Sequence, residues 1–572
     1  MTIRRPEVLA PAGSLDALAA AIAHGANAVY FGVGALNARV RATNITVEQL
    51  PSIVAYAHRH KVKVHVALNV PMRPETLDEA VHALGAVALA GADAVILRDP
   101  ILMELARHEC PSLAVHASTQ AGVSNAESAR RMRALGCSRV ILARECSLED
   151  MRAIRQACPD LEMESFLFGA QCFGISGSCL LGEAVGHRSG NYGNCLQACR
   201  LPFVDDAGKP LGHPFSMMDL DYLRRVKDLV GAGVSSLKIE GRMKSPAWVG
   251  CVTAWSQRAA ESWRRGGLTD GEYQKFDAEI RTIYSRPRTD AFLDGERAAE
   301  KLIHTESPKH RGLSLPFRLK PERGRAYLLF EAPVEVSLRD GLLLQYESGE
   351  EEAVSIRELR EGAGRGTSIV AAGKTAWVPA PSRRVRALAL HSCQAVRRQY
   401  EVSAGELVKT AEESLLPMVV TAVILRAKSL TFEGSCGTFA HQATYALATE
   451  PARGAGFGPA SGERLFPEAR FDCESGLFVS PSALKALRRR FRDEFTDAYA
   501  AALTERTGLL QQRVATMELR YLPPDAELLA KGPAAVSRVT GLPPGNLATT
   551  GGDLFTIECG PNGTVVRHRE KP

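Results

Sequence analysis

The chain has 572 residues, of which 70 are Lys or Arg and 64 are Asp or Glu, so its formal net charge at pH 7 is only +6. This length allows about three or four domains, and the small charge neither requires nor excludes nucleic acid as a partner. No run of about 18 apolar residues could cross a membrane, and the opening MTIRRPEVLAPAG lacks the apolar segment of a signal peptide. Because the thirteen cysteines are odd in number, we expect reduced thiols, a cytoplasmic location and no membrane partner.

The first 250 residues alternate between short β-branched runs and helical stretches rich in Ala, Leu and Arg. One such stretch, SLDALAAAIAHG, ends at Gly25, as expected just beyond a helix terminus. Alternation of this kind implies right-handed βαβ units, and eight strands predict a (β/α)8 barrel, with an open doubly wound sheet as the alternative. The eight predicted strands are residues 7–12, 28–33, 62–68, 94–99, 113–119, 139–145, 163–169 and 235–241.

Charged and polar residues gather toward the carboxyl ends of these strands, where barrels of this type carry their chemistry. The candidate catalytic residues are His116, Glu164, Lys238, Glu240 and Arg242. The last three alternate along the eighth strand and therefore project to one side of it. We expect the set to line a pocket, because unneutralised charges there would be costly without a ligand. The alternative is a paired network that fills the barrel.

A cysteine-rich loop follows the seventh strand, so we expect it over the same face of the barrel. Its cysteines are Cys172, Cys179, Cys195 and Cys199, in the pattern C-x6-C-x15-C-x3-C with several glycines between them. Four thiolates on a glycine-rich loop can enclose one tetrahedral metal ion or one iron–sulfur cluster. The spacing differs from the short C-x2-C pairs of most structural zinc sites, which favours a cluster. A chance grouping of four cysteines is the remaining alternative.

The later part of the chain changes character. We predict an α/β protein, in which a (β/α)8 TIM-like barrel is followed by a small β-barrel domain and a C-terminal α+β region. The predicted boundaries are 1–305 for the barrel with its cysteine loop, 306–404 for the small β-barrel, 405–505 for an additional α+β domain and 506–572 for a Pro/Gly-rich region.

Ordered motifs across roughly residues 6–260 resemble those of the U32 "collagenase-like peptidase" family. They are PEVLAPAG, NAVYFG, HASTQ, ILARE-x-SLE, E-x-F-x-x-G-A-x-C-x6-C, GNC-x-QACR-x-PF and SLKIEGRMKSP. Several members resemble oxygen-independent hydroxylases with a [4Fe-4S] cluster, which act on transfer RNA uridine, ribosomal RNA cytidine or the ubiquinone ring. The resemblance places the cluster ligands at the same four cysteines. In some relatives the fourth ligand lies elsewhere in the chain, which leaves Cys199 open.

A second, shorter resemblance concerns the segment FVSPSALKALRR at residues 478–489, which is similar to the extra domain of the ribosomal RNA cytidine hydroxylase branch. The resemblance thus implies an enzyme that hydroxylates a base in RNA, with a cytidine of 23S ribosomal RNA as the expected substrate. It further implies a [4Fe-4S] cluster, prephenate as a co-substrate, and an electron donor or cluster-assembly proteins as partners besides RNA. The regions after about residue 306 are expected to select the substrate.

Three other functions stay open. The first is peptidase activity, although the chain contains neither an HExxH motif nor a G-x-S-x-G motif. The second is hydroxylation of transfer RNA uridine or of a ubiquinone precursor. The third is a non-catalytic accessory role, in which the protein holds a cluster and modifies nothing.

Overall fold

The computed structural model describes residues 5–40, 42, 45–186, 188–412, 416–447, 449–452, 457–458, 462, 465–517, 534–537, 545–549, 554–560 and 563–569. Across these residues we find no helix whose length and hydropathy would let it span a bilayer.

Eight parallel strands close into a barrel, which confirms the predicted (β/α)8 fold. The open doubly wound alternative is excluded because the last strand, β11, pairs in parallel with both β1 and β7. The strands coincide closely with the eight predicted runs. They are β1 (Glu7–Pro11), β2 (Ala28–Gly32), β3 (Lys63–Leu68), β4 (Ala94–Leu97), β5 (Ala114–Ala117), β6 (Arg139–Ile141), β7 (Glu162–Gly169) and β11 (Val234–Glu240).

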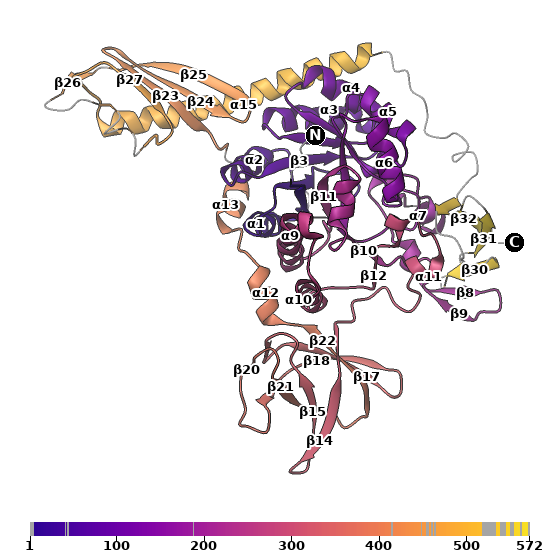
Figure 1. Ribbon diagram of the computed structural model, residues 1–572. Helices are drawn as coiled ribbons and strands as arrows, with labels where there is room; N and C mark the ends of the chain where they lie inside the picture. The colour runs from indigo at the N-terminus through magenta and orange to yellow at the C-terminus, as the bar shows by residue number, and fades with distance from the viewer. Residues whose placement is uncertain are drawn as a thin grey trace.

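Helices cover the outside of the barrel (Figure 1). Several begin at a serine or asparagine whose side chain accepts a hydrogen bond from the first helical turn, including Ser14, Asn125 and Ser147. The helices are α1 (Leu15–Ala23), α2 (Leu50–Arg59), α3 (Pro74–Leu89), α4 (Pro100–Glu109), α5 (Ala126–Ala134), α6 (Leu148–Ala157), α8 (Val226–Gly231), α9 (Pro246–Glu261) and α10 (Asp270–Arg281).

The connection between β7 and β11 is long and carries the four cysteines. It contains α7 (Leu181–Gly186), two 3-10 turns (Gly190–Tyr192 and Ala198–Arg200), the hairpin β8 (Phe203–Asp205) and β9 (Pro210–Gly212), and β10 (Asp219–Asp221). Strand β10 runs antiparallel to the end of β7, with Leu220 opposite Gly169. The cysteine loop therefore lies at the carboxyl end of the barrel, as predicted.

A separate antiparallel domain follows the barrel and occupies the lower part of Figure 1. In β17, alternate residues such as Leu342 and Leu344 are buried, which is the pattern expected of a half-exposed sheet. Its strands are β13 (Leu313–Leu315), β14 (Phe317–Glu322), β15 (Arg325–Glu331), β16 (Val336–Ser337), β17 (Gly341–Tyr346), β18 (Glu351–Ser355), β19 (Arg360–Glu361), β20 (Ile369–Val370), β21 (Thr375–Pro379) and β22 (Val385–Ser392). Helices α12 (Gln394–Tyr400) and α13 (Gly405–Glu412) then lead back along the barrel (Figure 1).

The next region is a sheet covered by one long helix. The sheet contains β23 (Val419–Arg426), β24 (Ser429–Cys436), β25 (Phe439–Ala446) and β27 (Arg470–Cys473), and the helix is α15 (Pro481–Thr516). Phe491 and Phe495 of this helix are fully buried in the core that it shares with the sheet. Beyond them α15 crosses the predicted boundary at residue 505 and packs against the barrel helix α3, where a Cβ at Gly85 would lie 3.4 Å from Leu510 Cδ1. The helix therefore joins the added sheet to the barrel.

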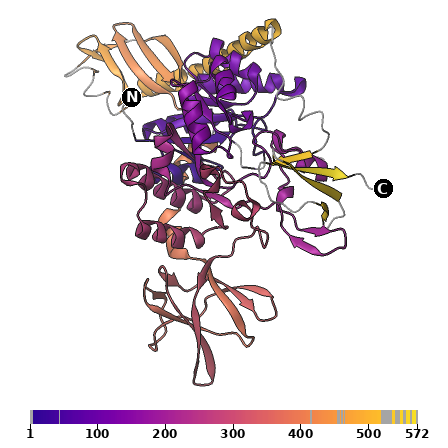
Figure 2. The same ribbon diagram turned by 45° about the vertical axis from the view of Figure 1, so that its right-hand side comes forward.

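The last strands of the chain return to the cysteine-loop connection. β29 (Ala534–Ser537), β30 (Gly545–Thr549), β31 (Leu554–Gly560) and β32 (Gly563–Arg569) form one sheet with β8 and β9, in the order β29-β32-β31-β30-β8-β9. Figures 1 and 2 show these yellow strands beside the hairpin and α7. The described parts of residues 506–572 are thus helix and strand, and the end of the chain belongs spatially to the barrel.

A substitution at Gly169 tests whether the backbone at the start of the cysteine loop requires a glycine. This glycine has φ +125°, and a Cβ there would lie 2.1 Å from the backbone oxygen of Glu240. We expect Gly169→Ala to lower the free energy of unfolding by about 2–4 kcal/mol, because strained backbone and a steric clash add together. Gly231→Ala is the matched control, because it meets nothing within 4 Å. Urea unfolding followed by circular dichroism measures both, and equal stabilities of the two variants would contradict this account.

Candidate functional site

The centre of the barrel holds a network of buried ion pairs. Glu164 on β7 is 0% exposed, and its carboxylate lies 2.9 Å from Lys238 Nζ and 3.2 Å from Arg139 Nη1. Arg139 also contacts Glu7, at 2.6 Å, near the opposite end of the barrel. Burial alone would raise the pKa of Glu164, but Lys238 and Arg139 hold it below its usual value. Glu164 is therefore ionised and fully paired.

Two buried histidines lie beside this network. The rings of His65 and His116 meet edge to face, with centroids 4.9 Å apart. Burial lowers the pKa of His65 to about 4 and that of His116 well below its usual value, so both are neutral at pH 7. Together with Glu164 they form the only group of three metal-ligating side chains with ligand atoms all within 4.8 Å, among the residues described. Because Lys238 and Arg139 already take the Glu164 oxygens, a third cation there would be repelled.

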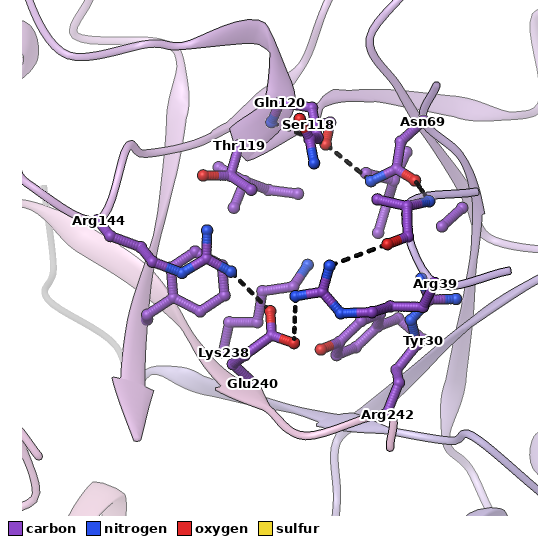
Figure 3. Close-up of a pocket in the computed structure, with 15 residues that line it drawn as sticks. Tyr30, Arg39, Asn69, Ser118, Thr119, Gln120, Arg144, Lys238, Glu240 and Arg242 are labelled. Carbon is purple, nitrogen blue, oxygen red and sulfur yellow. Dashed lines mark hydrogen bonds and ion pairs between the residues drawn. The ribbon is translucent and has the colours of Figure 1, made fainter. Parts of the chain in front are cut away.

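A pocket lies above the network at the carboxyl ends of the strands (Figure 3). Its free volume is about 40 Å³, room for about three water molecules. A larger ligand must therefore displace long side chains such as those of Arg39 and Arg242. The lining residues are Tyr30, Ala38, Arg39, Ala67, Asn69, Ile96, Ser118, Thr119, Gln120, Ile141, Arg144, Phe166, Lys238, Glu240 and Arg242.

One carboxylate organises the cations of the pocket. Glu240 contacts Arg144 at 2.7 Å and Arg39 at 3.2 Å (Figure 3). Burial alone would raise the pKa of Glu240, but the guanidinium groups around it lower that pKa to about 2. Arg144 is held further by the face of Phe166, with its guanidinium carbon 4.2 Å from the ring centroid. The loop that carries Arg39 is fixed by Asn69, which accepts a hydrogen bond from the Ala38 N–H at 3.0 Å.

Arg242 differs from the other cations of the pocket. Its side chain is buried, its Nη1 has no hydrogen-bond partner, and no ion pair to it is found among the described residues. Burial, aided by the like charge of Arg39, lowers the pKa of Arg242 to about 10, so it remains charged at pH 7. Gly32 leaves room for it, because a Cβ there would lie 2.6 Å from Nη1. A buried, unpaired guanidinium at the wall of a pocket is suited to bind an anion.

The four cysteines lie at the same end of the barrel, in two environments. Cys172 and Cys195 are exposed, whereas Cys179 and Cys199 are half-buried. A hydrogen bond with the Cys179 thiol, aided by the nearby Arg144, lowers the pKa of Cys172 to about 6. Burial raises the pKa of Cys199 to about 12. The guanidinium groups of the pocket thus favour a thiolate at Cys172.

Glycines leave room for the sulfur atoms. A Cβ at Gly174 would lie 2.7 Å from the Cys179 Cβ, and one at Gly190 would lie 3.8 Å from the Cys195 Sγ. Cys195 Sγ also accepts a hydrogen bond from the Gln197 N–H, at 3.3 Å. Sulfur donors in such a loop suit a thiophilic metal centre and not a hard cation such as Mg²⁺.

The structure separates the five predicted barrel residues into two layers. Lys238, Glu240 and Arg242 line the pocket, as expected of a catalytic set. His116 and Glu164 lie one layer deeper in the barrel. Glu164 belongs to the buried network, which is the alternative left open by the sequence, whereas His116 lies beside that network against His65. Sequence reasoning missed Arg39, which lies in a loop after β2 where no periodic pattern marks it, and Tyr30, which is hidden in an apolar strand.

Comparison with known proteins places the chain in a family. The model of the family described as "Peptidase family U32" matches residues 13–303. The chain belongs to peptidase family U32. This confirms the resemblance that the sequence motifs indicated.

Three relatives of this U32 chain illustrate the range of the family. The "23S rRNA 5-hydroxycytidine C2501 synthase" of Escherichia coli (strain K12) is 35% identical over 320 residues, which cover 54% of this chain and 48% of the relative. The "tRNA hydroxylation protein P1" of Bacillus subtilis (strain 168) is 31% identical over 54% of this chain and 75% of the relative. The "Collagenase" of Porphyromonas gingivalis (strain ATCC BAA-308 / W83) is 31% identical over 52% of this chain and 76% of the relative. The chain thus spans about half the length of the Escherichia coli synthase.

Acid should lower the stability of the barrel, because protonation breaks the ion pairs of its buried carboxylates. The pKa of Glu7 is lowered from 4.5 to about 2, against the effect of burial, by Arg139. Its ion pair therefore contributes stability that is complete above pH 4.5 and is lost as the pH falls toward 2. We expect Glu7→Gln to lower the free energy of unfolding by about 3 kcal/mol at pH 6 and by only about 1 kcal/mol at pH 3.

Urea unfolding at both pH values measures this difference. Glu127→Gln removes a surface carboxylate that pairs with Arg131, and should change the stability by less than about 0.5 kcal/mol at either pH. If Glu7→Gln had the same effect at both pH values, the Glu7–Arg139 ion pair would not lose its stabilising effect between pH 6 and pH 3.

Proposed function

We propose that this chain is an RNA-modifying enzyme that hydroxylates a cytidine of 23S ribosomal RNA without molecular oxygen, using a [4Fe-4S] cluster held by Cys172, Cys179, Cys195 and Cys199. The observation that carries the proposal is the position of the cysteine loop at the mouth of a cationic barrel pocket. Relatives named as RNA-hydroxylating proteins are 31–35% identical to this chain over 54% of its length.

The spacing of the cysteines favours a cluster over a single metal ion. Most structural zinc sites use short C-x2-C pairs, whereas these four cysteines follow the pattern C-x6-C-x15-C-x3-C on a glycine-rich loop. Four thiolates in such a loop suit a polynuclear iron–sulfur centre. When bound, a [4Fe-4S] cluster supplies one-electron redox chemistry.

The protein provides positive charge close to these sulfurs. Arg39 interacts electrostatically with Cys172 and Cys195, and Arg200 interacts with Cys199 and Cys172. Such guanidinium groups offset the negative charge that several thiolates would bring into one loop. Arg200 also orders the loop, because its Nη1 donates a 2.8 Å hydrogen bond to the Ser216 hydroxyl.

The pocket is suited to a small dianion as co-substrate. Lys238 is neutralised by Glu164, and Glu240 offsets one of the three arginines Arg39, Arg144 and Arg242. Two positive charges therefore remain in the pocket, and a ligand would share them with the nearby thiolates. Guanidinium binds carboxylate through two parallel hydrogen bonds, so a dicarboxylate such as prephenate fits this charge pattern. Arg242, which has no partner to give up, would take one carboxylate.

The regions outside the barrel would bring the RNA to this site. A base in folded RNA must leave its stack before a barrel pocket can reach it, which costs a few kcal/mol. Phosphate contacts from the β13–β22 domain and from the sheet under α15 would offset that cost and make binding dependent on salt. We place the reaction in the cytoplasm, where an electron donor and cluster-assembly proteins would be its protein partners.

The cluster has a direct test. Protein purified without air should be brown, with broad absorbance near 400 nm that a reductant bleaches. Cys172→Ser and Cys179→Ser should abolish this colour and the bound iron. Cys473→Ser, a half-buried cysteine on β27, is the matched control and should retain both. A colourless protein with one zinc per chain would refute the proposed cluster.

The reaction is tested by mass spectrometry of nucleosides from a strain that lacks the gene. Ribosomal RNA of that strain should lack one hydroxycytidine, and the wild-type gene should restore it. Arg242→Ala should restore at most about a tenth of it, because a charge-assisted bidentate contact contributes about 1.5–3 kcal/mol. The matched control is Arg130→Ala on the barrel helix α5, whose side chain is 56% exposed, and it should restore the full amount.

Two outcomes would count against this reading. Loss of iron or of folding in Arg242→Ala would show that the residue is structural. Unchanged ribosomal RNA with a missing transfer RNA hydroxyuridine would move the target to transfer RNA.

A further inference from the structure

The cysteine loop has a back face that packs on a small apolar core, separate from the core of the barrel. Cys179 and Cys199 lie against this core, whereas the exposed Cys172 and Cys195 lie near Arg39 of the pocket. Its buried members are Phe173, Leu181, Ala198, Phe203, Phe215, Met217, Phe292, Leu302, Ile303 and Ile557.

One member of this core comes from the far end of the chain. Ile557 lies on β31 and is 2% exposed. More than 350 residues of the sequence separate it from Cys199, which packs against the same core. Neighbouring strands reach the same place, because β29 and β32 contact α7, which follows Cys179 directly. The end of the chain therefore completes the apolar surface behind two of the four cysteines.

Backbone pairing fixes this arrangement. Strand β30 pairs antiparallel with β8, with Leu547 opposite Asp205 and Thr549 opposite Phe203. Without β30, β8 would be an edge strand with unpaired N–H and C=O groups next to the cysteine loop. Phe203 lies at the junction, because its side chain is in the apolar core and its backbone is in the shared sheet.

We propose that strands β29–β32 form a cover that closes the back of the cysteine site and excludes water and small solutes from Cys179 and Cys199. The apolar shell around a metal centre controls solvent access to it. A charged group in place of Ile557 could not stay in this core, because burying an unpaired carboxylate is costly. The cover would then detach, and the sulfur atoms behind it would become accessible.

The test uses the full chain with single substitutions, after bound metal has been removed by a chelator under anaerobic conditions. The thiols are pulsed with a small maleimide and each cysteine is quantified by peptide mass spectrometry. In Ile557→Glu we expect Cys179 and Cys199 to react about tenfold faster than in the parent, because local opening governs labelling of protected groups. Thr556→Glu is the matched control, because adjacent residues of a strand face opposite sides.

Two internal checks keep the result interpretable. Cys137 and Cys251, buried in the barrel core, should stay protected in every variant if the barrel remains folded. Ile557→Ala, a milder change, should accelerate labelling in the same direction but less. Equal labelling of Cys179 and Cys199 in the parent, Ile557→Glu and Ile557→Ala would overturn the proposal, as would equal acceleration by Thr556→Glu.

A second measurement connects the cover to the cluster and rests on the proposed function. Iron release from the brown protein to a chelator should be several-fold faster in Ile557→Glu than in Thr556→Glu. A parent protein that binds no iron would refute the proposed cluster but not the cover, because maleimide labelling needs no metal. Iron release at equal rates in both variants would show that the cover does not protect the cluster.

Discussion

The ion pair between Glu164 and Lys238, with Arg139 on the other carboxylate oxygen, is the interaction on which the site depends. Charges at the centre of a closed eight-stranded barrel are removed from water, and leaving one unpaired there would cost several kcal/mol. The paired side chains form the floor of the pocket. Pairing also fixes Lys238, so that the next inward residue of β11, Glu240, stands at the height of the mouth.

Charge at the mouth then connects the pocket with the cysteine loop. Glu240 holds Arg39 and Arg144 in place, and the same guanidinium groups lower the pKa of Cys172. A small anion in the pocket and a thiolate centre above it would therefore share one set of cations. Through these shared cations, a ligand in the pocket would alter the electronic properties of the proposed metal centre.

The sequence predicted the barrel well, because most of its parallel strands are short, largely apolar runs between helical stretches. For the eighth strand it also predicted that Lys238, Glu240 and Arg242 project to one side, but it did not predict how deep in the barrel each candidate residue lies. His116 and Glu164 lie one layer below the pocket, and the next inward residues, Ser118 and Phe166, line it instead. Alternation fixes the side, whereas depth depends on strand tilt in the closed barrel. The pairing of β30 with β8 was beyond sequence reasoning, because no local pattern encodes a contact over such a separation.

The most direct test of the account is anomalous X-ray diffraction at the iron edge from crystals grown without air. We expect one compact group of iron atoms bounded by the four sulfurs of Cys172, Cys179, Cys195 and Cys199, on the side of the loop that faces Arg39 and Arg144. A single zinc atom at these cysteines, or iron bound only at another place in the molecule, would contradict it.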